Sequence, residues 1–149
     1  MKADRKSFCI VCIANYCRSP VAEKLLAKKL SDKIEFSSCG LNPKVEANMD
    51  YRSSDFLEQN DITSTYHVPK KISEEIIKNS DLILCMDAHV LMHLNLKFSK
   101  YKSKYKIFSY ICPEIRIEDP YRMDSSKYIA VMEKIKDVSE RYNYQDLFN

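Results

Sequence analysis

Short apolar runs alternate with amphipathic stretches along most of this chain, and this alternation restricts the fold more than any other feature. The first run, 7–12 (SFCIVC), is β-rich and apolar on both faces, as a central parallel strand is. Further strands are predicted at 33–39, 81–86 and 105–110. Helices are predicted at 19–30, 50–60, 72–79, 87–96 and 125–142. Strands that alternate with helices form βαβ units with right-handed crossovers, so the sequence predicts an α/β fold on a parallel sheet.

The 149 residues are enough for one domain with a hydrophobic core and too few for two comfortable ones. We therefore expect 1–149 to be a single domain. Hydrophobic residues make up 45% of the chain, charged residues 30%, and the formal net charge is +3, a balance typical of a soluble globular protein. The lysine-rich segment 97–106 (KFSKYKSKYK) could present a surface for nucleic acid or acidic lipid, but we expect a solvated loop and a short strand edge.

The basic start MKADRK, followed by an apolar run, could be read as a signal peptide. The run is too short, Asn15 and Arg18 close it, and no small-residue cleavage pattern follows, so we interpret it as a core strand. No apolar stretch approaches transmembrane length, and we expect a cytoplasmic protein with no membrane partner. The six cysteines are then expected to be reduced thiols. They form no paired CxxC knuckles, and His89 and His93 have no third ligand, so no metal site is predicted.

The segment CIANYCRS, 12–19, lies at the predicted turn between the first strand and the first helix. Ligands of parallel α/β sheets bind at the carboxyl ends of strands, which is where this turn lies. Ser19 and Pro20 are typical of a helix start, with Ser19 as the N-cap. The backbone N–H groups of the turn and of the helix start can converge on an anion, and such a site favours a thiolate over a thiol.

The side chains of this segment suit phosphate chemistry. Arg18 has a planar fork of donors that can hold two phosphate oxygens at once. Asn15 can adopt the left-handed conformation in the middle of the turn. Cys12, an anion cradle and an arginine together predict phosphoryl transfer through a phosphocysteine. The spacing alone is also compatible with Cys12 ending a core strand, Cys17 packing beneath a helix and Arg18 pairing with a carboxylate.

The stretch VCIANYCRSPVAE, 11–23, resembles the signature of the low-molecular-weight protein tyrosine phosphatases, V-C-x-G-N-x-C-R-S-P-x-A-E. Further similar blocks follow in the family's order and cover nearly all of 7–142. They are SSCG at 37–40, MDYRSSDFLEQNDI at 49–62, DLILCMDAHVLMHL at 81–94 and IEDPY at 117–121. The resemblance implies a four-stranded parallel sheet flanked by helices, with a phosphate-binding loop between the first strand and the first helix.

The resemblance also implies a role for each matching residue. Cys12 would be the nucleophile, and Asp119 would protonate the leaving phenolate and then deprotonate the hydrolytic water. Phosphate would be held by the Arg18 side chain and by the loop backbone, which consists of Ile13, Ala14, Asn15, Tyr16, Cys17 and Arg18. This scheme needs no metal or cofactor. Its partners would be phosphotyrosine proteins or small aryl phosphates and not nucleic acid, and we expect a monomer or weak dimer.

Supporting residues are implied in the same way. The family's hydrogen-bond network under the loop maps onto Asn15, Ser19, Ser38 and His67. Ser19 would give the thiolate a hydroxyl donor. Tyr121 would form a wall of the substrate cleft. Cys17 lies five residues after Cys12, and the two could form a reversible disulfide on oxidation.

The chain departs from the family pattern at Ala14, in the loop 41–49 and at Arg122. Ala14 stands where the family has glycine, and it would be strained by roughly 1 kcal/mol or more if that position required positive φ. The loop 41–49 lacks the aromatic residue that often walls the cleft, and Lys44 is nearest to that place. Arg122 replaces the usual aromatic neighbour of Tyr121. One aromatic wall and added positive charge predict a preference for acidic phosphopeptides.

Two other functions stay open. A thiol-coupled arsenate reductase resembles this fold and begins with the same cysteine–arginine loop, but it needs further cysteines at relay spacing. Here Cys85 lies within a predicted strand, Cys112 comes next, and the retained DPY of the last block favours a phosphatase. A phosphate-binding module that has lost catalysis would fit Ala14, although the cysteine, arginine and aspartate are all retained. Taken singly, Asp119 before a proline could be a turn former and His67 an ordinary loop histidine.

Overall fold

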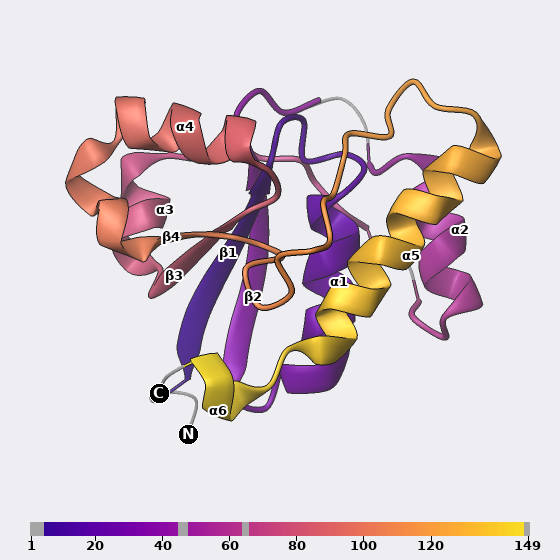
Figure 1. Cartoon of the computed structure of the whole chain (residues 1–149), viewed down its shortest axis with the longest axis horizontal. Helices are drawn as coiled ribbons and strands as arrows, with labels where there is room; N and C mark the ends of the chain where they lie inside the picture. Colours follow the sequence, from indigo (N-terminus) through magenta and orange to yellow (C-terminus); the bar gives the residue numbers. More distant parts are fainter. Residues whose placement is uncertain (1–4, 45–47, 64–65, 148–149) are drawn as a thin grey trace.

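A four-stranded parallel sheet lies at the centre of the protein (Figure 1). The structure, a computed structural model, describes residues 5–44, 48–63 and 66–147. The order of the strands in the sheet is β2-β1-β3-β4. They are β1 Lys6–Cys12, β2 Ile34–Gly40, β3 Leu82–Cys85 and β4 Tyr105–Ile107. The predicted fold class, a parallel sheet flanked by helices, is confirmed.

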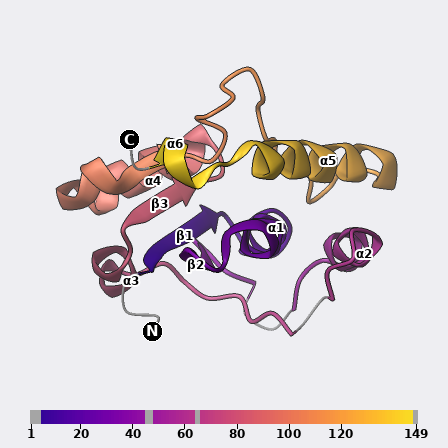
Figure 2. The same ribbon diagram turned by 90° about the horizontal axis from the view of Figure 1, so that it is seen from below.

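Helices cover both faces of this sheet (Figure 2). On one face lie α1 Ser19–Leu30 and α5 Ser125–Arg141, with α2 Tyr51–Gln59 packed against both. On the other lie α3 Glu74–Asn79 and α4 Ala88–Lys97. A 3-10 helix, η1 Ser99–Lys104, follows α4, and α6 Tyr144–Leu147 comes last in the described chain. Among the described helices, none is long and apolar enough to cross a membrane.

Strand β1 shows why both faces of the sheet are covered. Its side chains alternate between the faces, so a central strand with helices on both sides must be apolar throughout. Phe8, Ile10 and Cys12 belong to the core under α1 and α5. Cys9 and Val11 belong to the core under α3 and α4. The strand therefore ends, at Cys12, between two packed layers that hold it rigidly.

The predicted start of α1 needs a correction. Ser19 is the first residue of the helix and not its N-cap, so that prediction is wrong. The N-cap position is Arg18, which makes no side-chain capping bond. The Ser19 hydroxyl is instead hydrogen-bonded to Cys12 and Asn15, two residues of the preceding loop. The Ser19 hydroxyl, which the sequence pattern assigns to helix capping, is used by the loop instead.

The lysine-rich segment 97–106 is also corrected, because most of it forms η1 and not a loop. The Tyr101 hydroxyl donates to Glu74 at 2.8 Å, and the Lys104 ammonium donates to two carbonyls at the end of α3. These contacts with α3 order a segment whose composition is typical of a solvated loop. Strand β4 is shorter than predicted because the chain turns from Phe108 onward.

Candidate active site

Asn15 organises the loop that joins β1 to α1. Its φ is 53°, the left-handed conformation expected for it. Its side chain is buried, and Nδ2 donates to the hydroxyls of Ser19 at 2.8 Å and Ser38 at 3.0 Å. Oδ1 accepts a hydrogen bond from the Lys70 N–H at 3.0 Å. A buried amide with all of these groups satisfied holds the loop backbone in one conformation.

Cys12 lies at the base of this loop, where β1 ends. Its Sγ atom is 2.9 Å from the Ser19 Oγ, and the residue is only 3% exposed. Because the Ser19 oxygen already accepts a hydrogen bond from Asn15, the hydroxyl proton is available to the sulfur. A donor in this position stabilises negative charge on the sulfur.

His67 and Ser38 extend the network beneath the loop. His67 Nε2 donates to the Asn15 carbonyl oxygen at 2.8 Å. Burial lowers the pKa of His67 and outweighs the opposite effect of that hydrogen bond, so the ring is neutral near pH 7. Ser38 donates to the Glu23 carboxylate at 2.5 Å, which links β2 to α1. The structure thus joins Asn15, Ser19, Ser38 and His67 through hydrogen bonds.

Arg18 is fixed by two acceptors from distant parts of the chain. Its side chain is 2% exposed, and Nη1 donates to Asp87 Oδ2 at 2.8 Å and to the Ile117 carbonyl at 3.1 Å. Within the described residues both side-chain hydrogen bonds use Nη1, so the other guanidinium donors are left for an anion. Asp87 is held in turn, because its second oxygen accepts from the Val90 N–H as the N-cap of α4. Asp87 is absent from the predicted site, and its only signal in the sequence is an acidic residue that opens a helix.

Gly40 is the only glycine in the sequence, and it lies directly beneath the loop. A Cβ atom there would be 2.8 Å from the Ile13 carbonyl oxygen and 2.9 Å from the Asn15 nitrogen. Its φ is not positive, so close approach of two backbones, and not conformation, requires glycine here. The loop is also tied to this strand end, since the Leu41 and Asn42 N–H groups donate to carbonyls of residues 12 and 13. Gly40 is not among the residues predicted for the site.

Asp119 lines the same pocket as residues of the loop. The pocket has a volume of about 380 Å³ and is lined by Cys12, Arg18, Asp119 and Tyr121, among others. One Asp119 oxygen accepts from the Tyr121 N–H at 3.2 Å. Arg52 donates to the Tyr121 carbonyl at 3.2 Å and pairs with Asp50 at 2.9 Å. The residues after Asp119 are therefore anchored to α2.

Lys44 and Tyr121 line the pocket, and Tyr16 packs against both of them. The Tyr16 and Tyr121 rings are 6.1 Å apart between centroids. The Lys44 ammonium lies 4.5 Å from the Tyr16 centroid and donates to the Tyr121 hydroxyl at 3.0 Å. A cation and two aromatic faces thus meet above the phosphate loop.

Residues 7–147 match the family described as low molecular weight phosphotyrosine protein phosphatase. The chain belongs to this family. The Wzb low molecular weight protein-tyrosine-phosphatase of Salmonella typhi is 31% identical over 122 residues, covering 82% of this chain and 81% of that protein. The mouse low molecular weight phosphotyrosine protein phosphatase is 31% identical, covering 87% and 88%. A Wzb structure from Escherichia coli K30, in complex with sulphate, has a TM-score of 0.85 at 26% identity, covering 92% and 95%.

The phosphatase loop of this chain tolerates its departure from the family signature. Ala14 does not have positive φ, since Asn15 and Asp61 are the only non-glycine residues of the described chain that do. The alanine is therefore free of the strain that a left-handed position would impose.

The cysteines of this phosphatase are free thiols and all buried. Cys17, the proposed redox partner of Cys12, is itself a residue of the loop and is 6% exposed. Burial raises the pKa of Cys17 to about 12, although a hydrogen bond to Tyr128 acts in the opposite direction. Its thiol is therefore almost fully protonated near pH 7.

Proposed function

We propose that this chain hydrolyses phosphotyrosine and other aryl phosphate monoesters through a phosphocysteine intermediate. The observation that carries the proposal is that Cys12, Arg18 and Asp119 line one pocket at the carboxyl end of β1, although Asp119 is far from the other two in sequence. Together they supply a nucleophile, an oxyanion clamp and a proton donor. Membership of the phosphatase family supports the assignment.

In the first step, Cys12 Sγ attacks phosphorus as the bond between phosphorus and the phenolic oxygen breaks. The guanidinium of Arg18 and the N–H groups of 13–18 hold the phosphoryl oxygens and the charge that develops on them. Asp119, as a carboxylic acid, gives its proton to the leaving phenolate. The step leaves a phosphocysteine, a free phenol and an Asp119 carboxylate.

In the second step, the Asp119 carboxylate takes a proton from a water molecule, whose oxygen attacks phosphorus. The bond between sulfur and phosphorus breaks, and the electron pair returns to Cys12 as a thiolate. Ser19 stabilises that leaving thiolate through its hydroxyl, which lies 2.9 Å from the sulfur. Inorganic phosphate leaves, and the enzyme returns to its starting protonation state.

The mouth of the pocket indicates the substrate class. Tyr121 lines the pocket and packs against Tyr16, so an entering aryl group can contact the Tyr121 ring. Lys44 lies at the rim, and the exposed Arg122 follows Tyr121 directly, so a peptide with acidic residues beside its phosphotyrosine meets two cations. We expect a higher kcat/KM for acidic than for neutral phosphotyrosine peptides, with the difference reduced in Lys44→Ala. Equal values would refute this preference.

The assay that tests the reaction compares the wild type with two variants on aryl phosphates of different leaving groups. Cys12→Ser should abolish turnover and keep phosphate binding, since the loop remains. Asp119→Ala should lower kcat by about 10²–10⁴ for a poor leaving group, and much less for a phenolate that needs no proton. Equal losses for all leaving groups would show that Asp119 is not the acid. Phosphate binding without turnover in the wild type would indicate a non-catalytic module.

An arsenate reductase is less well supported by the buried thiols. Cys85 is fully buried in β3 and Cys112 is 3% exposed. Burial raises the pKa of Cys85 to about 12 and also raises that of Cys112. Relay cysteines must be accessible and form thiolates readily, and neither of these does. Thiol-dependent arsenate reduction measured beside the phosphatase assay tests this alternative.

A further inference from the structure

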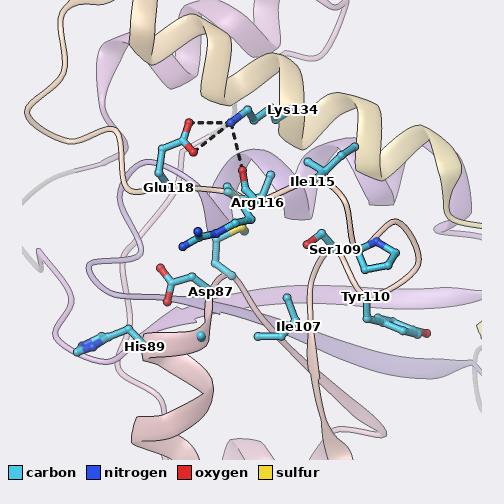
Figure 3. A pocket seen from close by; sticks show the side chains of 13 residues that line it. Asp87, His89, Ile107, Ser109, Tyr110, Ile115, Arg116, Glu118 and Lys134 are labelled. Atoms are coloured by element: carbon cyan, nitrogen blue, oxygen red, sulfur yellow. Dashed lines mark hydrogen bonds and ion pairs between the residues drawn. The ribbon is translucent and has the colours of Figure 1, made fainter.

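A second, larger pocket of about 980 Å³ lies behind the Arg18–Asp87 pair, between the start of α4, the end of β4 and α5 (Figure 3). None of its lining residues lines the phosphate pocket. Its volume falls within the roughly 300–1,000 Å³ that small-molecule sites span. The mechanism proposed above makes no use of it.

The walls of this second pocket are mostly apolar. Met86, Ile107, Ile115 and Ile117 line it, and Tyr110 lies at one end. Such a surface can bury the hydrocarbon or aromatic body of a ligand. The charged or polar side chains among the lining residues determine which ligand fits, and they include Asp87, His89, Ser109, Arg116, Glu118 and Lys134.

Among the residues that the structure describes, the Arg116 cation of this pocket has no side-chain partner. Asp87 is neutralised by Arg18, and both oxygens of Glu118 accept from Lys134 at 3.0 Å. The Arg116 guanidinium makes no hydrogen bond or ion pair with the rest of the described chain, and Figure 3 shows it reaching across the pocket beside Asp87. A planar, unpaired guanidinium over an apolar wall matches a carboxylate on an apolar body.

We propose that this pocket binds a small amphipathic carboxylate, with the carboxylate on Arg116 and the apolar body on the isoleucines. Two residues that line the pocket also fix Arg18: Asp87 accepts from it at 2.8 Å and the Ile117 carbonyl at 3.1 Å. Residue 118 of the pocket wall also directly precedes Asp119. The site is therefore placed to modulate the phosphate pocket.

The coupling between the two sites has a predictable sign. The ligand's charge is neutralised by Arg116, so it adds little repulsion to a phosphate bound at Arg18. Both the ligand and an active-site anion restrain Asp87 and Ile117, so each should bind more tightly in the presence of the other. By linkage the factor is the same in both directions, and we expect about fivefold. This coupling, unlike the binding itself, rests on the function proposed above.

The test uses the full chain, with 2-naphthoate as the probe. Binding is measured by calorimetry and by amide NMR shifts, with and without saturating inorganic phosphate. We expect saturable binding, amide shifts at Ile115 and Ile117, and a Kd lowered about fivefold by phosphate. Arg116→Ala should raise the Kd about tenfold or more, because a charge-assisted hydrogen bond is lost. The matched control Lys102→Ala, which removes an exposed cation on η1, should leave the Kd unchanged.

The uncharged analogue 2-naphthamide should bind to the wild type as weakly as 2-naphthoate binds to Arg116→Ala. The Kd of 2-naphthamide should be the same for the wild type and for Arg116→Ala. Competition between phosphate and 2-naphthoate would place the probe in the phosphate pocket and overturn the proposal. Absence of saturable binding, or an unchanged Kd in Arg116→Ala, would overturn it as well. If instead phosphate does not bind at all, while 2-naphthoate binds through Arg116, the proposed phosphatase function fails and the second site stands.

Discussion

Replacing Gly40 by alanine would place a methyl group against the backbone of the phosphate loop. The new Cβ would lie 2.8 Å from the Ile13 carbonyl oxygen, 2.9 Å from the Asn15 nitrogen and 3.0 Å from the Ala14 carbonyl carbon. All three neighbours are backbone atoms, so no flexible side chain can move aside. Either the loop or the end of β2 must shift.

The size of the effect follows from these distances. An ordinary van der Waals contact of a Cβ atom is 3.4–4 Å, so the contact at 2.8 Å requires a shift of about 0.6 Å or more. Overpacking a rigid site by one methyl group costs about 1–3 kcal/mol of unfolding free energy. A misplacement of 1 Å can cost about 10²-fold in rate, so a shift of a little more than half that size should lower kcat/KM about tenfold.

Urea unfolding measures the free energy, and turnover of an aryl phosphate measures kcat/KM on the folded enzyme. Phosphate affinity should fall together with kcat/KM, because the same N–H groups bind both. Ile83→Val is a matched control: it removes a methyl group from the fully buried side chain of Ile83 in β3 and should cost about 0.5–1.5 kcal/mol without touching the loop.

Two results would refute the reasoning about Gly40. If Gly40→Ala keeps the wild-type kcat/KM and stability, the two backbones do not approach as closely as the structure shows. If it lowers stability but keeps kcat/KM and phosphate affinity, as we expect of Ile83→Val, the glycine serves packing alone and does not position the loop.

Three further changes probe the loop. Asp87→Asn should lower the unfolding free energy by about 1–3 kcal/mol, because Arg18 loses its charged acceptor. Saturating phosphate should stabilise this variant more than it stabilises the wild type. Equal stabilisation of the two proteins in urea unfolding would contradict this. Ala14→Gly should leave kcat/KM unchanged and lower stability by up to about 1 kcal/mol, since Ala14 has no unfavourable φ to relieve; a gain in turnover would count against it. After peroxide oxidation of Cys12, disulfide formation with Cys17 should become about tenfold faster per pH unit above neutral. Burial raises the pKa of Cys17 to about 12, and only the Cys17 thiolate attacks the oxidised Cys12. A disulfide-formation rate that mass spectrometry finds independent of pH would oppose this.

Local patterns in the sequence were sufficient for much of the fold. The apolar run of β1 and the helical stripe of α1 are periodic, and periodicity depends only on neighbouring residues. Asn15 could be assigned its left-handed conformation for the same reason, since its short polar side chain tolerates it. Ser19 shows the limit of such reasoning, because a hydroxyl typical of an N-cap is used by Cys12 and Asn15.

The sequence by itself determined the order of strands and helices, and it placed a cysteine and an arginine at the carboxyl end of β1. The tertiary structure decided which distant groups meet there. From the sequence, Asp87 could be interpreted only as an acidic residue that opens a helix, and the fold pairs it with Arg18. The sequence gives no reason for a glycine at residue 40, and the fold places Gly40 against the backbone of the loop. The physical reason is that helix starts and strand periods are set by nearby residues, whereas a salt bridge or a close backbone approach depends on how whole elements pack.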